Sequence, residues 1–442
     1  MATTNSLDAH STLEHRTIRK VSRRIIPFLI ILYFLSFLNR VNVAFAGLTM
    51  NHDLGFTNAI FGTGAGVFFI GTFIFGTPSN IALHRIGARR WIALMMLAWG
   101  SLSAANALAT NPTSFYLLRF FIGVAEAGFF PGVILYLSFW YPTRHRAFVT
   151  AIFMAAAPLS NMIGSPISGA LLQYTNGVAH LHGWQWLFIV EALPTVVLGF
   201  VALVYLTDKP EDAQWLEQDE RRWLTQELEK EHSEKAARSA SNVWVAFKDI
   251  RVWLLALVYS GTSMGLYAIG FWAPMLLKQF GFSFVELGII NAIPNLVAVV
   301  GMVYWGRRSD RQRERRLHVA IACLAGAFGM VVAGQAASAL VLVIALSVAN
   351  FGINAAKPPF WSMPTLFLSS SAAAAGIGLI NSVGSSIGGT VGQMVIGKLR
   401  DLSGNYSSGL YFVSATLVLS AVIAVLFGRP AASKVEMRSP SK

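Results

Sequence analysis

The sequence has few charged residues and almost no cysteine. Only 12% of its 442 residues are Asp, Glu, Lys or Arg, against roughly 25% in a soluble domain, while 55% are hydrophobic. The single cysteine, Cys323, excludes an internal disulfide and a thiolate metal site. The composition therefore argues against a soluble domain and is typical of a protein that crosses a membrane several times.

Several other signals are absent. The first 24 residues are polar and charged and lack a signal-peptide pattern. No Ser/His/Asp grouping lies at one membrane depth and no Walker loop occurs, and the glycines of "GTGAG" fall inside an apolar run. We therefore expect no enzyme, no metal, no cofactor and no use of ATP. The net charge of +13 does not indicate nucleic acid, because the basic residues fall in short groups rather than on one polar face.

Apolar runs dominate what is present. A membrane-spanning helix needs about 20 apolar residues, and the sequence predicts an all-α membrane protein with twelve of them. They cover about 24–47, 58–82, 90–109, 113–138, 146–173, 184–206, 250–276, 284–306, 316–335, 338–366, 371–397 and 407–428.

The longest polar stretch divides these runs into two sets of six. It is rich in charge and reads as a partly helical cytoplasmic linker. The predicted organisation is an N-terminal tail, a six-helix bundle, the linker, a second six-helix bundle and a C-terminal tail, at residues 1–23, 24–206, 207–249, 250–428 and 429–442.

Lysine and arginine predict the orientation. They gather in the N-terminal tail and in the loops after the second, fourth and eighth runs. The intervening loops "TMNHDLGFT", "ATNPTS" and "YTNGVAHLHGW" contain neither residue. Because short basic loops stay in the cytoplasm, both termini are expected inside, at an inner (plasma) membrane. Lys398 and Arg400 lie on the expected outer side and are the exception.

The two halves carry a matching landmark. "HRIGARR" follows the second run and "DRQRERR" the eighth; His84 and Asp310 are 226 positions apart, as are residues 24 and 250, where the halves begin. This spacing is typical of transporters built from parallel repeats.

These features resemble the major facilitator superfamily. The segments "FLSFLNRVNVAFAGLTMNHDLGF", "LLRFFIGVAEAGFFPGVILYLSFWYP", "GWQWLFIVEALPTVVLG" and "GIGLINSVGSSIGG" resemble, more narrowly, its anion:cation symporter family. That family includes permeases for tartrate, phthalate, 4-hydroxyphenylacetate and sugar acids. The resemblance implies a proton-coupled symporter of organic anions.

The resemblance also implies roles for single residues. Arg40 matches the arginine that holds the substrate carboxylate, and Glu126 matches the fourth-helix acid of proton handling. This sequence departs at two positions: Asn39 replaces the usual aspartate of an Asp-Arg pair, and Thr72 replaces a common tyrosine. Proton stoichiometry and substrate identity are therefore open.

Arg40 lies about 16 residues into its run, or about 24 Å along a helix. A charge at that depth costs at least about 2.5–3.5 kcal/mol, and the planar guanidinium suits a carboxylate held by two hydrogen bonds. The alternative is a structural salt bridge to Glu126 or a backbone carbonyl.

Glu126 and Arg119 are seven residues apart and share a helical face. A carboxyl whose charge balance changes with conformation can carry a proton across the membrane. The alternative is a permanent pair of Glu126 with Arg119 or Arg40 that fixes helix packing. Glu191, the other embedded acid, is expected to be structural.

Further substrate contacts are expected from the second half. Asn381 and Ser385 share a face of the eleventh helix, with Gln393 farther along it, and Tyr267 and Trp361 can bound a substrate. The alternatives are interhelical hydrogen bonds and core aromatic packing.

The basic loops predict a cytoplasmic gate. Their charges can pair and cap helix ends in one conformation, although the same residues also serve the positive-inside rule. His84 stands where an aspartate is usual. The expected gate residues are Arg85, Arg89, Arg90, Asp310 and Arg311.

The sequence thus predicts a secondary active transporter that imports a small organic acid with protons by alternating access. It is expected to be a monomer in the lipid bilayer that binds no nucleic acid. A uniporter or exchanger, a symporter coupled to another ion, and a non-transporting membrane sensor are the alternatives.

Overall fold

A computed structural model describes the chain except residues 1, 155, 239–246, 313, 365–369 and 428–442, and its described part is a bundle of helices without strands. The longer helices are α1 (Ala2–Asp53), α2 (Asn58–Ile86), α3 (Ala88–Ala105), α4 (Pro112–Glu126), α5 (Phe129–Ser138), α6 (Thr143–Met154), α7 (Ala156–Tyr174), α8 (Gly183–Tyr205), α9 (Gln218–Arg238), α11 (Ile250–Lys278), α12 (Phe284–Gln312), α13 (Arg316–Gly334), α14 (Ala339–Ala355), α16 (Ser370–Ser403) and α17 (Ser407–Leu426). The short helices are η1 (Asn106–Leu108), η2 (Val178–His180), η3 (Pro210–Asp212) and α15 (Lys357–Trp361).

The apolar runs become helices because a bilayer offers no partner for a free backbone N–H or C=O group. Within the described residues, eleven helical segments are long and apolar enough to cross a membrane. The Gly- and Ser-rich α16 has 34 residues and occupies the place of the remaining expected span. The expected all-helical fold is therefore confirmed, with most ends within a few residues of those predicted.

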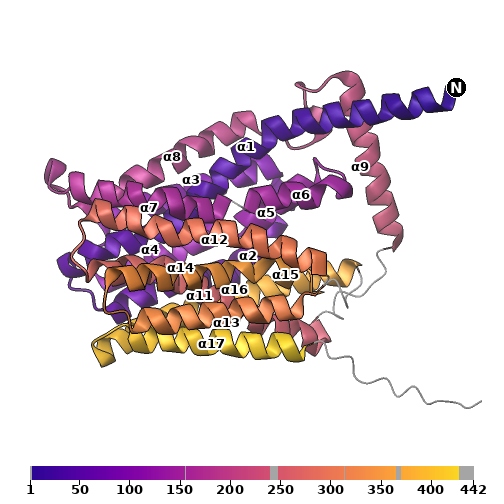
Figure 1. Cartoon of the computed structure of the whole chain (residues 1–442). Helices are drawn as coiled ribbons and strands as arrows, with labels where there is room; N and C mark the ends of the chain where they lie inside the picture. Colours follow the sequence, from indigo (N-terminus) through magenta and orange to yellow (C-terminus); the bar gives the residue numbers. More distant parts are fainter. Residues whose placement is uncertain (1, 155, 239–246, 313, 365–369, 428–442) are drawn as a thin grey trace, which may run out of the picture.

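Several helices extend beyond their predicted spans, among them α1, α12 and α16, which ends at Ser403. α1 has 52 residues, or about 78 Å at 1.5 Å per residue, so its first part projects past the bundle beside α9 (Figure 1). α12 continues through the basic loop as far as Gln312. The fourth span is interrupted at Ala127 and Gly128, between α4 and α5.

The end of the bundle from which α1 projects is here the proximal side, and the end with the α1–α2 loop is the distal side. The two halves meet closely at the distal side. The Asp401 carboxylate at the end of α16 accepts hydrogen bonds from the N–H groups of Asn58 and Ala59 at 3.1 and 2.7 Å, and so caps α2.

Glycines allow a second distal contact, between α7 and α12. A methyl group on Gly288 would lie 2.4 Å from the Ser165 carbonyl oxygen, and one on Gly169 would lie 2.2 Å from that of Phe284. Only glycine permits so close a backbone approach. Both contacts join the two halves at the distal side.

We expect Gly352→Ala to destabilise the fold. The new methyl would lie 2.3 Å from the Gly326 nitrogen and 2.4 Å from the Ala322 oxygen, so α13 and α14 must separate. Overpacking of this kind costs about 1–3 kcal/mol, and thermal unfolding of the purified protein measures it. Gly378→Ala is the matched control, since nothing lies within 4 Å of its added methyl. Equal unfolding midpoints for the two variants would contradict this packing.

Candidate functional site

An ion pair joins α1 to α4 in the middle of the first half. The Nη2 group of Arg40 contacts the Oε1 oxygen of Glu126, and the Ser36 hydroxyl donates to the same oxygen. The Glu126 side chain is 2% exposed and that of Arg40 14%. The salt bridge considered from the sequence is thus present in this conformation, with Ser36 as a third member.

A second arginine lies beside this pair. The guanidinium carbons of Arg40 and Arg119 lie 5.2 and 5.1 Å from the centroid of the Phe68 ring on α2. Arg119 is fully buried, and none of its guanidinium nitrogens has a hydrogen-bond partner among the described residues. Glu126 is therefore paired with Arg40 and not with Arg119. The site thus holds two arginines and one carboxylate, which leaves it with an excess of positive charge.

Tyr267 connects the second half to this site. Arg40 donates from Nη1 to the Tyr267 hydroxyl at 3.5 Å, a long contact. The Tyr267 ring lies 4.4 Å from that of Phe69 on α2. Helices α1, α2, α4 and α11 therefore meet around Arg40.

Asn39 and Thr72, the two departures from the family pattern, hydrogen-bond to neighbouring helices. The Asn39 amide donates to the Thr195 hydroxyl on α8 at 2.7 Å. The Thr72 hydroxyl donates to the carbonyl oxygens of Phe68 and Gly123 at 3.0 and 3.3 Å. Neither side chain makes a described hydrogen bond to Arg40 or Glu126.

Trp361 and Ser385 lie near each other but away from Arg40. The Trp361 ring is 4.8 Å from that of Tyr259, and Ser385 is within hydrogen-bonding reach of the same tyrosine. Tyr259 precedes Tyr267 by eight residues on α11, or about 12 Å toward the proximal side. Asn381 is half-buried, one turn before Ser385 on α16.

Gln393 is far from this cluster and holds helices together. Its side-chain oxygen accepts a hydrogen bond from the Trp272 indole at 2.8 Å, and the side chain is fully buried. Its backbone oxygen would lie 2.3 Å from a methyl on Gly62. These contacts tie α16 to α11 and α2, which is the interhelical alternative considered for such residues.

The expected gate residues do not bridge the halves in this conformation. The Arg89 N–H donates to the Asp208 carboxylate at 2.8 Å, which caps α3. Asp310 pairs with Arg315 of its own half at 2.5 Å. Arg85, Arg90 and Arg311 are exposed, and none of the three forms an ion pair in the described part of the chain.

The sequence analysis missed three residues of the site: Ser36, Phe68 and Thr195. Ser36 precedes Arg40 by four residues and Phe68 precedes Thr72 by four, so the helical repeat was an available signal for both. Thr195 had no such signal, because its contact with Asn39 depends on how α1 and α8 cross.

A chain of buried amides in the second half was also missed. Asn350 donates to Asn295 at 3.1 Å, Asn354 donates to Asn350 at 2.8 Å, and Lys357 donates to Asn354 at 2.8 Å. Asn291 extends the set to the first half by donating to Ser165 at 2.9 Å. This set links α12, α14 and α15 to α7.

A bundle of membrane-spanning helices in two halves, with more arginines than carboxylates near its centre, is typical of a membrane transporter. The chain belongs to the Major Facilitator Superfamily, whose model matches residues 29–393. The relatives described next are also transporters, and none is an enzyme.

One relative is the "Putative tartrate transporter" of Agrobacterium vitis, 53% identical over 97% of this chain and 95% of that protein. Another is the "Quinolone resistance transporter" of Acinetobacter baumannii, 41% identical over 93% of this chain and 94% of that protein. A solved bacterial homologue of the human lysosomal transporter Spinster, in an inward-facing and unoccupied conformation, has the same fold; its TM-score is 0.74 at 17% identity, over 92% of this chain and 96% of that one. The tartrate relative agrees with the resemblance to the anion:cation symporter family.

The charge imbalance predicts that Glu126→Gln destabilises the protein more than Arg40→Gln does. Without Glu126 two buried arginines remain, and arginine cannot lose its proton. Without Arg40 the carboxyl retains Arg119 nearby and can become neutral. Removing one partner of a buried pair costs about 3–5 kcal/mol, so we expect Glu126→Gln near that range and Arg40→Gln below it.

Thermal unfolding in detergent measures both variants, with exposed Glu211→Gln as the control. The double variant Arg40→Gln/Glu126→Gln should be more stable than Glu126→Gln alone. A larger loss for Arg40→Gln than for Glu126→Gln would contradict the charge balance described here.

Proposed function

We propose that this protein is a symporter that imports a small organic anion together with protons by alternating access. The observation that carries the proposal is the presence of two arginines, Arg40 and Arg119, beside a single carboxylate that pairs with Arg40 alone. The excess positive charge of such a site attracts a further anion, and the carboxylate of a substrate can bind there. Intramembrane charges of this kind ordinarily mark substrate and ion pathways.

In the proposed mechanism, the substrate carboxylate and Glu126 compete for Arg40. The planar guanidinium binds the arriving carboxylate through two hydrogen bonds. Glu126, displaced from its cation, is then a buried charge without a partner and takes up a proton. Ser36 keeps a hydrogen bond to the carboxyl in either state, because a hydroxyl can donate or accept.

A monocarboxylate and one proton together leave the net charge of the site unchanged, because the negative charge of the substrate replaces that of Glu126 beside the arginines. Without proton uptake, substrate and Glu126 would both be ionised and would have to share the arginines, so the proton removes one of two competing buried negative charges. The two halves can then rock about the site, as in other transporters built from repeats. Release of the proton and the substrate restores the Arg40–Glu126 pair.

We place the protein in an inner membrane. The proximal side of the bundle is proposed to face the cytoplasm. The Lys and Arg residues of the loops support it. In that orientation the Asp401 cap and the contact of α7 with α12 hold the two halves together on the outer side. Import begins when these distal contacts open.

The proposed substrate is a carboxylate with further polar groups, and the protein is proposed to act as a monomer in the bilayer. Asn381 and Ser385 are the candidate partners for those groups in the second half. The names of the two relatives refer to tartrate and to quinolone resistance. Tartrate is therefore the first probe of this chain, followed by a thermal-shift screen of organic acids.

Uptake into proteoliposomes tests the coupling. We expect an acidic exterior to drive accumulation of radiolabelled tartrate, or of the acid that the screen identifies. Glu126→Gln should abolish this response to the pH gradient while exchange of internal for external substrate persists. Glu211→Gln serves as the control.

Uptake that ignores the pH gradient, with Glu126→Gln equal to the wild type, would instead indicate a uniporter, an exchanger or coupling to another ion. Ligand binding without any net uptake would indicate a sensor.

The replacement of aspartate by Asn39 predicts a stoichiometry of one proton per substrate. A monocarboxylate would then move no net charge, whereas a dicarboxylate would carry one negative charge inward. Asn39→Asp should add one proton to each transport cycle and make transport more positive by one charge, because the new carboxyl can bind and release a proton. The Thr195 hydroxyl can hydrogen-bond to this carboxyl in either state, as donor or as acceptor.

Charge movement in reconstituted membranes, measured beside tracer flux, gives this ratio. Competition by unlabelled acids reports selectivity. A change in selectivity without a change in charge per substrate would show that the role given to Asn39 and Arg40 is wrong.

A further inference from the structure

A cavity of about 950 Å³ lies against the proximal part of α1, outside the central site. Basic residues of α1 line it, together with Tyr205 at the end of α8 and Trp215 in the segment before α9. Since Tyr205 ends a membrane-spanning helix, the cavity lies where the apolar bundle meets water. Neither the charge pair nor the gate residues border it.

The cations of this cavity follow the repeat of α1. Arg19, Lys20, Arg23 and Arg24 lie three, four, seven and eight positions after Arg16, so all five share one side of the helix. Five positive charges within about two turns repel one another and require anions nearby.

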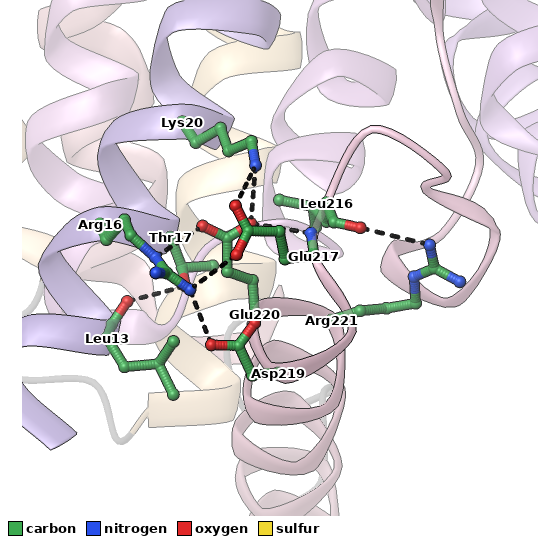
Figure 2. A network of polar contacts seen from close by, with 9 residues as sticks. All are labelled: Leu13, Arg16, Thr17, Lys20, Leu216, Glu217, Asp219, Glu220 and Arg221. Carbon is green, nitrogen blue, oxygen red and sulfur yellow. Dashed lines mark hydrogen bonds and ion pairs between the residues drawn. The ribbon is translucent and has the colours of Figure 1, made fainter. Parts of the chain in front are cut away.

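Part of that requirement is met by the segment that begins α9, as Figure 2 shows. Arg16 contacts Asp219 at 2.7 Å and Glu220 at 3.0 Å, and Lys20 contacts Glu220 at 3.0 Å. Glu217 lies 3.2 Å from Arg16. Glu220 is fully buried beneath these cations. The acidic residues therefore compensate the charges of Arg16 and Lys20.

The other three cations have no such compensation. Arg19, Arg23 and Arg24 form no ion pair with any carboxylate in the part of the chain that the structure describes. Arg19 and Arg23 are exposed and line the cavity. The uncompensated charge is thus concentrated at the depth of lipid headgroups.

Arg24 is held in place by aromatic rings. Its guanidinium carbon lies 4.7 Å from the centroid of Tyr205 and 5.1 Å from that of Trp215. Trp215 in turn stacks on Trp140 with centroids 5.4 Å apart. A guanidinium fixed in this way loses little freedom when it binds a ligand.

We infer that this cavity binds a phosphate group, carried by the headgroup of an anionic lipid or by free phosphate. Arginine matches phosphate oxygens through paired hydrogen bonds. Tyrosine and tryptophan are typical of protein surfaces at headgroup depth. A topology signal requires only basic residues, whereas this site also has a cavity and an aromatic wall that positions one of its cations.

Binding to the purified full-length protein tests the inference. Dioctanoyl phosphatidic acid, dioctanoyl phosphatidylcholine and inorganic phosphate are titrated separately, and thermal stabilisation is recorded. We expect phosphatidic acid to stabilise the wild type and phosphatidylcholine to have little effect. Stabilisation by inorganic phosphate at equal concentration would assign the site to free phosphate, and its absence would assign it to the lipid headgroup.

The variant Arg19→Gln/Arg23→Gln should bind the stabilising phosphate compound roughly 30-fold more weakly, which corresponds to about 1 kcal/mol for each removed cation. Arg307→Gln/Arg308→Gln is the matched control, because it removes two exposed arginines from the same side of the bundle. Arg19→Lys/Arg23→Lys should retain most of the affinity, and its unliganded unfolding midpoint shows whether the fold is intact.

Wild-type affinity in Arg19→Gln/Arg23→Gln would overturn the inference. So would an equal loss in the control variant, which would indicate general surface attraction, and so would the failure of every phosphate compound to stabilise the wild type.

Discussion

The presence of two embedded arginines beside one carboxylate is the constraint on which the rest of this structure depends. In a medium of low dielectric constant, Arg40, Arg119 and Glu126 cannot all be satisfied without another anion. The surrounding helices hold this imbalance in place: Ser36 orients the acid and Phe68 presents its ring to both guanidinium groups. Helix α1 carries much of the arrangement, since it supplies both Ser36 and Arg40.

Much of the fold could be predicted from the sequence because a lipid bilayer restricts which backbone structures can cross it. It requires long apolar helices with internally paired backbones, and these are visible as runs of about 20 residues. Arg40 was identifiable as a site residue because a charge at that depth is costly and usually marks a substrate or ion pathway. The span of α16 was predicted as well, although glycine and serine there replace bulky apolar residues and let neighbouring helices approach closely.

The partners within the site could not be read from the sequence. Helical spacing placed Arg119 and Glu126 on one face, yet the closer cation to Glu126 comes from α1, because the crossing of α1 and α4 decides the distance. The same limit applies to Asn39 and Gln393, which hydrogen-bond to Thr195 and Trp272. Spacing along one helix gives the face of a residue, but the partner depends on tertiary packing.

The docking of α9 has a mechanical consequence. Its residues Glu220, Glu227 and Glu231 are bound to Lys20, Arg144 and Thr143 of the first half, so α9 is carried by that half as a rigid arm. With 21 residues it is about 30 Å long, and a tilt of about 10° would displace its far end by roughly 5 Å over that length. A fluorophore near that end would therefore report a small rotation of the buried helices as a larger displacement on the aqueous side.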